Sequence, residues 1–422
     1  MTEDEPEGKK KVSEGRRAAE ANGDLVDRGA MDCRGLRSGG WRGGLVVAVA
    51  MAGTMTAALG QSLRDGNLQV HGFATQSLVY GSGNNYLGMD TTSGSLGWTE
   101  AAVNVNDQLT DKLRVGVQLH LTRLGAFGGN VPTVDWALVD YSAKPWLGIR
   151  AGKVKIKWGL FNDTQDADPG YLWSLLPESV YGIDVRATNL SQYGAELYGK
   201  IRAGEHLGSL EYSAYYGYYY YASNDGYGAS FAQQGITFTH PGFGKTPGFD
   251  LRWSTPVKGL TVGGSLMMYN ASGTLTNGTY HQPLAFWPTY YAQYKRKKLY
   301  AAWQYVRLVQ YQTVSIDGSA PATSGLDTRA WFAMGGYHVT DKLQLGTYYT
   351  RYTVPSAGDN SNSANSFKDA VISGRYDINA HLYTKVEGHL IHGNALGFYA
   401  LDNSNALVPT TNLVVAKVGV TF

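Results

Sequence analysis

The chain is almost free of cysteine. Its only residue of this type is Cys33, among 422 residues. Cys33 precedes the apolar stretch at 43–60, so the part of the chain that follows this stretch contains no thiol. Disulfide bonds are therefore excluded, and so are metal sites built from several thiolates.

Long apolar runs and excess charge are also missing. After residue 60 no segment offers the roughly 20 consecutive apolar residues that a membrane helix needs. The mean hydropathy is -0.26, and the formal net charge is only +2. A near-neutral chain offers no general basic field, which excludes nucleic acid as a partner.

Local signatures of catalysis are absent as well. The sequence contains neither a G-x-S-x-G nucleophile elbow nor an H-E-x-x-H zinc motif, and both are compact enough to be recognised in one sequence. We therefore expect no catalytic residue, no metal ligand and no cofactor. A hydrolase site assembled from separate strands stays open as an alternative, as does an adhesive or structural role for long loops.

The amino-terminal region has the pattern of an export signal. Residues 31–60 carry Arg34, Arg37 and Arg42, then an apolar core, and end on the small-residue site Ala58-Leu59-Gly60. We interpret 31–60 as a signal peptide, with a single membrane anchor as the alternative. Residues 1–30 are polar and aperiodic, and we interpret them as a disordered leader or a mis-called start. Residues 61–422 are expected to form one β-barrel.

Period-two alternation dominates the chain from residue 68 onward. Segments of about ten residues alternate apolar and polar side chains, which is typical of half-buried strands. Short connections are expected at 107–112, 143–146, 202–206, 255–259, 295–298, 340–342 and 377–381. Long connections are expected near 81–97, 125–131, 159–191, 221–247, 271–287, 315–329, 354–366 and 393–412.

These fifteen connections predict an all-β fold of about 16 antiparallel strands. Short periplasmic turns, long extracellular loops and an even strand number are typical of a transmembrane β-barrel. A soluble β-sandwich is the alternative, but it requires apolar residues packed between two sheets and leaves the export signal unexplained.

The final segment, LVVAKVGVTF (413–422), alternates most clearly. Val414, Val418 and Phe422 share an apolar face with their neighbours of the same parity, and Lys417 lies on the other face. An exposed apolar strand of this kind promotes aggregation in water, whereas in a membrane barrel its apolar face is buried in lipid. The segment resembles the terminal strand of Gram-negative outer-membrane barrels. The resemblance implies that the barrel-assembly machinery recognises this strand.

Two further segments resemble porins. Residues 150–182, RAGKVKIKWGLFNDTQDADPGYLWSLLPESVYG, resemble the strand and inward-folded third loop of Gram-negative porins, and residues 373–393 resemble their late hairpin. The whole pattern is most similar to the porin superfamily that includes the phosphate-selective O/P type. This resemblance implies a homotrimer in outer-membrane lipid that lets small hydrophilic solutes or ions diffuse passively, with a phosphate-type anion preference.

Alternation also predicts which basic side chains line the channel. Lys153, Lys155 and Lys157 share one parity, and each would cost about 2 to 4 kcal/mol in the lipid midplane. We expect them to face the lumen and attract anions, although any water-filled barrel carries some charge on its wall. The other predicted channel-lining residues are Arg114, Arg252, Arg375, Lys385 and Lys417. Acidic residues share the same faces, so the expected wall is mixed in sign.

The connection 159–191 is too long for a simple hairpin and is rich in acids. If it folds inward, as the resemblance implies, its carboxylates face the basic wall across the constriction; an acidic surface loop is the alternative. The predicted constriction-loop acids are Asp163, Asp166, Asp168, Glu178 and Asp184. Residues 162–170 resemble part of a calcium loop but lack its spacing and terminal Glu, so no metal is expected.

Overall fold

The computed structural model describes residues 68–222, 224–240, 242–359 and 361–422, and every structural statement below refers to these ranges. The predicted leader at 1–30 and signal peptide at 31–60 lie outside them. No helix in the described ranges has both the length and the apolar character needed to cross a membrane.

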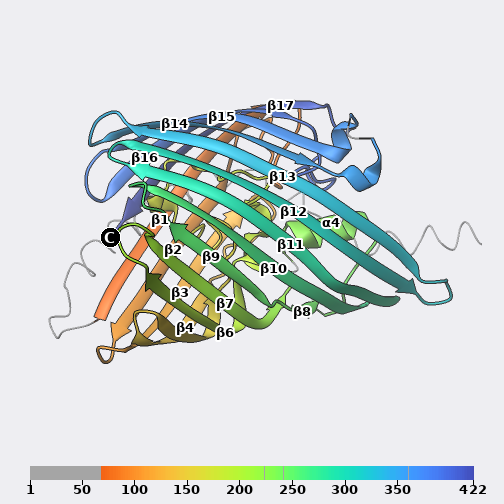
Figure 1. Ribbon diagram of the computed structural model, residues 1–422. Helices are drawn as coiled ribbons and strands as arrows, with labels where there is room; N and C mark the ends of the chain where they lie inside the picture. The colour runs from red at the N-terminus through yellow and green to blue at the C-terminus, as the bar shows by residue number, and fades with distance from the viewer. Residues whose placement is uncertain (1–67, 223, 241, 360) are drawn as a thin grey trace, which may run out of the picture. The chain divides into compact units, whose positions relative to one another are not determined.

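One antiparallel sheet closes on itself because β1 pairs with both β2 and β17 (Figure 1). The short strands β8 and β9 both lie between β7 and β10. They form one wall strand, so the 17 labelled strands make a 16-stranded barrel, as the sequence predicted. The strands are β1 (Leu68–Ser82), β2 (Ser95–Gln108), β3 (Leu113–Leu124), β4 (Thr133–Lys144), β5 (Leu147–Lys155), β6 (Ser191–Arg202), β7 (Ser209–Tyr220), β8 (Phe243–Lys245), β9 (Gly248–Ser254), β10 (Leu260–Leu275), β11 (Gly278–Arg296), β12 (Leu299–Ile316), β13 (Ala322–His338), β14 (Leu343–Thr353), β15 (Ser366–Asp377), β16 (Leu382–His392) and β17 (Thr410–Thr421).

Short helices occur only between strands in the described chain. The β5–β6 connection contains η3 (Asp168–Gly170), η4 (Ile183–Val185) and α3 (Arg186–Asn189). The β7–β8 connection contains α4 (Gly226–Gln233), and the β14–β15 connection contains η5 (Pro355–Ala357) and η6 (Ser363–Asn365). Helix α4 begins after Asp225, whose side chain accepts hydrogen bonds from the Tyr227 and Gly228 amides and so caps the helix.

All seven predicted short turns lie at junctions between consecutive wall strands. Two of the predicted long loops, 271–287 and 315–329, are wrong in extent. Strand β10 continues to Leu275 and β11 begins at Gly278, while β12 and β13 are separated only by 317–321. These segments are rich in Thr, Ser and Gly, which suggested loops, but they pair in register across the hairpins.

Burial alternates along the wall strands and defines an outer and an inner face. In β17, Leu413, Val415 and Lys417 are buried on the inner face, whereas Val414 and Val418 are half-exposed on the outer face. The last residue is fixed to the first strand, because the backbone groups of Phe422 and Gly72 exchange hydrogen bonds of 3.0 and 3.1 Å. The Phe422 ring lies so close that a Cβ on Gly72 would be 2.3 Å from it.

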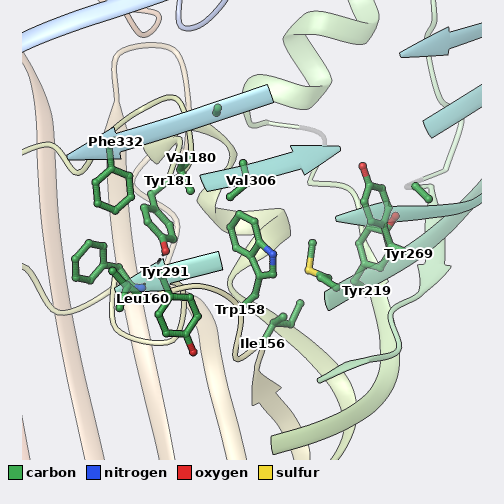
Figure 2. Close-up of a cluster of buried hydrophobic side chains, with 14 of the residues drawn as sticks. Ile156, Trp158, Leu160, Val180, Tyr181, Tyr219, Tyr269, Tyr291, Val306 and Phe332 are labelled. Atoms are coloured by element: carbon green, nitrogen blue, oxygen red, sulfur yellow. Dashed lines mark hydrogen bonds between the residues drawn. The ribbon is translucent and has the colours of Figure 1, made fainter. Parts of the chain in front are cut away.

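The apolar core lies inside the barrel. Trp158, Leu160 and Tyr181 of the β5–β6 connection pack against the inner faces of the wall strands, with Phe332 of β13 and Tyr269 of β10 in the same cluster (Figure 2). Figure 2 shows Trp158 at the centre of this group, between the Tyr181 side and the Tyr219–Tyr269 side. The part of the inner wall that faces this cluster is therefore covered by a packed loop rather than by open water.

Candidate channel lumen

The β5–β6 connection is fixed to the opposite wall at Asp168. One Asp168 oxygen lies 2.7 Å from Lys417 Nζ and the other 3.0 Å from Lys385 Nζ. The Tyr383 hydroxyl donates to the same carboxylate at 2.7 Å. Burial works to raise the pKa of Asp168, but the two ammonium groups outweigh it and hold the pKa well below its usual range. Asp168 is therefore a carboxylate, and it forms ion pairs with two fully buried lysines.

Two other predicted loop acids also contact basic wall residues. Asp166 lies 2.7 Å from Lys155 Nζ and accepts a 2.7 Å hydrogen bond from the Gln118 amide. Asp163 lies 3.7 Å from Arg252, which also donates to the Gly159 carbonyl. The acids and bases of this part of the lumen thus form direct pairs and are not separated by an open gap.

Hydrogen bonds between wall side chains and the loop backbone attach the middle of the loop to β15 and β16. Arg375 donates to the carbonyls of Pro169 and Tyr171 at 2.5 and 2.9 Å. Glu387 accepts from the amides of Ser174 and Leu175 at 2.6 and 3.1 Å. The loop is therefore held along its length by charged wall side chains, which are the stronger class of hydrogen-bonding partner.

Glu178 and Asp184 differ from the other three loop acids, because no basic side chain of the described residues pairs with them. Asp184 accepts a hydrogen bond from the Tyr399 hydroxyl, and Glu178 accepts one from the Ile183 amide at 3.3 Å. Burial raises the pKa of both carboxyls, and the charge of Asp184 raises that of Glu178 further. This end of the loop thus holds a pair of acids that favours the protonated form.

The three predicted ladder lysines lie in different surroundings. Lys153 is directly opposite Tyr193, whose ring is 51% exposed on the outer face, and its amine reaches the Val134 carbonyl. Lys155 turns inward to Asp166 where β5 ends. Lys157 follows the strand and lies within electrostatic range of Glu211 and Asp250. The structure does not bring these amines into one column.

Sequence reasoning missed Arg150, which has the inner-face position on β5. Its guanidinium pairs with Asp140 and Glu196, each at 3.1 Å, and lies 4.0 Å from the centre of the Tyr198 ring. The predicted residue Arg114 joins the same group through a 2.9 Å contact with Asp140. The apolar pair Ile149 and Ala151, which share the parity of Lys153, was the signal that the outer face lay there.

Sequence reasoning also missed a buried cluster of charged and polar side chains around Arg186, at the end of the β5–β6 connection. Arg186 pairs with Asp135 at 3.0 Å and lies 2.7 Å from His120 Nδ1. Arg186 is separated from these partners by more than 50 residues, and no local motif marks it. It joins the carboxyl end of the loop to β3 and β4.

The ion pairs of the lumen differ in which partner is exposed: the cation is the more exposed in the pairs of Arg114 and Arg150, and the less exposed in those of Arg186, Lys385 and Lys417. The Arg114 side chain is 41% exposed and that of Asp140 8%; Arg150 is 27% exposed and Glu196 2%. Lys155 and Arg252 likewise cover the almost fully buried Asp166 and Asp250. Arg252 is less exposed than its other partner Asp163, and Arg375 is less exposed than Asp377. Around Asp140 and Glu196 the accessible charge is therefore that of the guanidinium groups.

The described residues contain no group of three or more His, Cys, Asp or Glu side chains placed to hold a metal ion. In the segment 162–170, Asp166 and Asp168 are already paired with lysines. The Asn162 side-chain oxygen accepts a hydrogen bond of 2.8 Å from the Gln165 amide. The oxygen atoms that a calcium ion requires are thus used for internal contacts.

Comparisons with known proteins identify the fold. A scan against protein-family models and a search of curated proteins found no match. Among solved structures, OmpT of Vibrio cholerae matches with a TM-score of 0.53 and 12% identity, over 86% of this chain and 100% of that chain. The anion-selective porin from Comamonas acidovorans matches with a TM-score of 0.52 and 10% identity, over 84% and 99%.

The outer membrane channel DcaP of Acinetobacter baumannii gives a TM-score of 0.51 at 11% identity, over 84% of this chain and 97% of that chain. At this level of identity the likeness concerns the fold. The chain has the closed 16-stranded barrel of porin type that is found in outer-membrane channels.

Proposed function

We propose that this protein is an outer-membrane porin of a Gram-negative bacterium through which small hydrophilic solutes diffuse passively. The barrel presents half-exposed apolar side chains on its outer face, including Val414, Val418 and Leu390, which suits a lipid environment. Sixteen strands enclose more space than wall side chains alone fill. The β5–β6 connection narrows this space and leaves a polar lumen.

We further propose a preference for anions. The observation that carries it is the unequal exposure within the ion pairs of Arg114 and Arg150: these two side chains keep accessible surface while Asp140 and Glu196 are buried. A solute anion in the lumen meets the cationic groups directly, and the low-dielectric surroundings strengthen this attraction. The channel-lining role of Lys155, Lys157, Arg252 and Arg375 belongs to the same proposal. Lys385 and Lys417, predicted to line the channel, are fully buried and hold the loop instead.

Conductance in a planar bilayer tests the proposal. We expect the purified barrel, residues 61–422, to form ion-conducting channels. In a salt gradient, the reversal potential should have the sign of an anion-selective channel. Liposome swelling with sugars and anions of graded size then measures the pore. Folded protein without any conductance would disprove the channel function. A reversal potential with the sign of a cation-selective channel would disprove the anion preference alone.

A channel is favoured over a hydrolase by the contacts of the buried histidines. His389 lies 2.8 Å from Asp369 and 3.4 Å from Glu387, and His120 contacts Arg186. No serine or threonine hydroxyl of the described residues hydrogen-bonds to either imidazole, as a nucleophile in a triad would. A homotrimer, and recognition of β17 by the barrel-assembly machinery, remain part of the proposal through the porin likeness.

A further inference from the structure

Two separate parts of the β5–β6 loop approach one wall residue, Glu100 of β2. Glu100 is an inner-face residue that is only 6% exposed. One of its carboxylate oxygens lies 3.5 Å from Lys417 Nζ, which pairs with Asp168 of the loop. Its other oxygen lies 3.8 Å from Nε2 of His120, which contacts Arg186 of the loop. Glu100 therefore lies between two charged attachments of the loop.

His120 fills the space between Glu100 and Arg186 without adding charge. The Arg186 guanidinium lies 2.7 Å from His120 Nδ1, and a guanidinium only donates hydrogen bonds. Nδ1 must therefore accept, so the imidazole is neutral and carries its proton on Nε2, the nitrogen that faces Glu100. Arg186 also lies within electrostatic range of Glu100. The charge of Glu100 thus acts on both loop attachments.

The buried charges around Glu100 balance only as one group. Their side chains are at most 8% exposed; the cations are Lys385, Lys417 and Arg186, and the anions are Asp168, Glu100 and Asp135. The Asp168 attachment contains two lysines and one loop carboxylate, so it has an excess of positive charge without Glu100. Buried charges that lose their partners are costly. A change at one attachment therefore alters the charge balance at the other through Glu100.

We propose that Glu100 is a positioning residue that couples the two attachments, so that the β5–β6 loop is held or released as one unit. If Asp168 leaves the wall, Lys417 retains only Glu100, and its charge then cancels more of the attraction between Glu100 and Arg186. If Arg186 leaves, Glu100 and Asp135 remain as two buried carboxylates beside the neutral His120 ring and repel each other. The proposal rests on the porin function proposed above, in which this loop narrows the pore, but the coupling itself requires no conduction.

Amide hydrogen exchange of the purified barrel in detergent micelles tests the coupling. The perturbation is Asp168→Asn, and exchange is followed over 166–176, next to the change, and over 183–189, which contains Arg186. We expect exchange over 183–189 to become about tenfold faster in the Asp168→Asn barrel. In the Glu100→Gln background, Asp168→Asn should still speed exchange over 166–176 but change exchange over 183–189 less than about twofold.

Two control variants show whether the charge of Glu100 is the cause. Glu100→Asp keeps the carboxylate and should retain the coupling. Glu196→Gln removes another buried inner-wall carboxylate, which pairs with Arg150, and should also retain it. An equal effect of Asp168→Asn on 183–189 with and without Glu100 would assign the coupling to the loop backbone and overturn the proposal. Absence of any effect on 183–189 in the otherwise unmodified barrel would overturn it as well.

The double variant K417M/E100L keeps the test decisive if Glu100→Gln loosens the whole loop. It replaces one buried ion pair by apolar side chains of similar size, which is often neutral or stabilising. The remaining charges then balance within each attachment. We expect both loop segments to stay protected in this barrel, while Asp168→Asn speeds exchange only over 166–176. An effect of about tenfold on 183–189 in this background would overturn the proposal.

Single-channel recording separates this proposal from the porin function. We expect closures of the unmodified barrel to occur in one step and those of K417M/E100L to show an added intermediate level, because its two attachments release independently. One-step closures in both barrels would overturn the coupled release. Coupled exchange in a barrel that never conducts would refute the porin function alone. Conduction by a barrel without coupled exchange would refute the positioning role alone.

Discussion

Arg114 has the most exposed cationic side chain of the lumen ion pairs described above, at 41%, and is therefore the residue on which ion selectivity depends most directly. We expect Arg114→Gln to shift the reversal potential toward cations by several millivolts in a tenfold salt gradient, because it removes an accessible positive charge near the path of the solute. Arg114→Lys keeps the positive charge, so its reversal potential should equal that of the unmodified barrel.

Lys153 provides the matched control for this experiment. Its amine lies 5.4 Å from the centre of the Tyr193 ring on the outer face, so Lys153→Gln should leave the reversal potential unchanged. A shift in Lys153→Gln equal to that in Arg114→Gln would restore the lysine-ladder interpretation.

Asp168 is the residue on which attachment of the loop depends most. Asp168→Asn leaves Lys385 without a carboxylate partner and Lys417 with only Glu100 at 3.5 Å, and breaking a buried pair costs about 3 to 5 kcal/mol. We expect faster amide hydrogen exchange over 166–176 and larger current noise. The exposed Asp359→Asn is the control; equal protection in both variants would contradict this role.

At the scale of elements, α4 depends on the protonation of its capping residue. Burial raises the pKa of Asp225 to about 7, outweighing the hydrogen bond from Thr188. The folded helix therefore favours the proton: its extra stability is complete below pH 4 and is lost as the pH rises toward 7, at most about 1.4 kcal/mol for each pH unit.

Hydrogen exchange over 226–233, corrected for intrinsic rates, measures this effect. We expect protection of α4 to fall between pH 5 and 7.5 in the unmodified chain. Asp225→Asn keeps a capping side chain but removes the charge, so its protection should not change over this range. The same pH dependence in both proteins would exclude Asp225 as its origin.

Most elements could be predicted from the sequence, because alternation and turn residues are local signals. The seven short turns and the two faces of β17 follow from residues adjacent in sequence. The candidate site could not be predicted in the same way. Asp168 and Lys417 are 249 positions apart, so their contact depends on how the loop crosses the lumen.

The two faces of β5 show a second limit of prediction from the sequence. We assigned them by the rule that lysines avoid lipid, but Lys153 lies near a strand end where its amine reaches the Val134 carbonyl, as long amphipathic side chains do at interfaces. Arg150, with opposite parity, provides the inner-face charge. A strand with charges of both parities therefore needs its partners on neighbouring strands to fix its orientation.

At the scale of the whole molecule, the two ends of the β5–β6 loop respond oppositely to pH. The Asp168 end is held by charge pairs that are present at neutral pH and are lost when the pH falls through the lowered pKa of Asp168. The Glu178–Asp184 end favours protonated carboxyls, because burial raises both pKa values. Its contribution to loop packing is present at low pH and is lost as the pH rises through these raised values, when two buried carboxylates repel each other.

We therefore expect the open channel to become noisier, and its mean conductance to rise, as the pH is raised from acid to alkaline at constant salt. Asp184→Asn removes one of the two charges and retains an acceptor for the Tyr399 hydroxyl, so it should abolish most of this pH dependence. Asp359→Asn, in an exposed loop, should retain it. If conductance of the Asp184→Asn barrel still rises with pH as in the unmodified protein, the carboxyl pair does not control the loop, and the wall arginines alone would set the width of the pore.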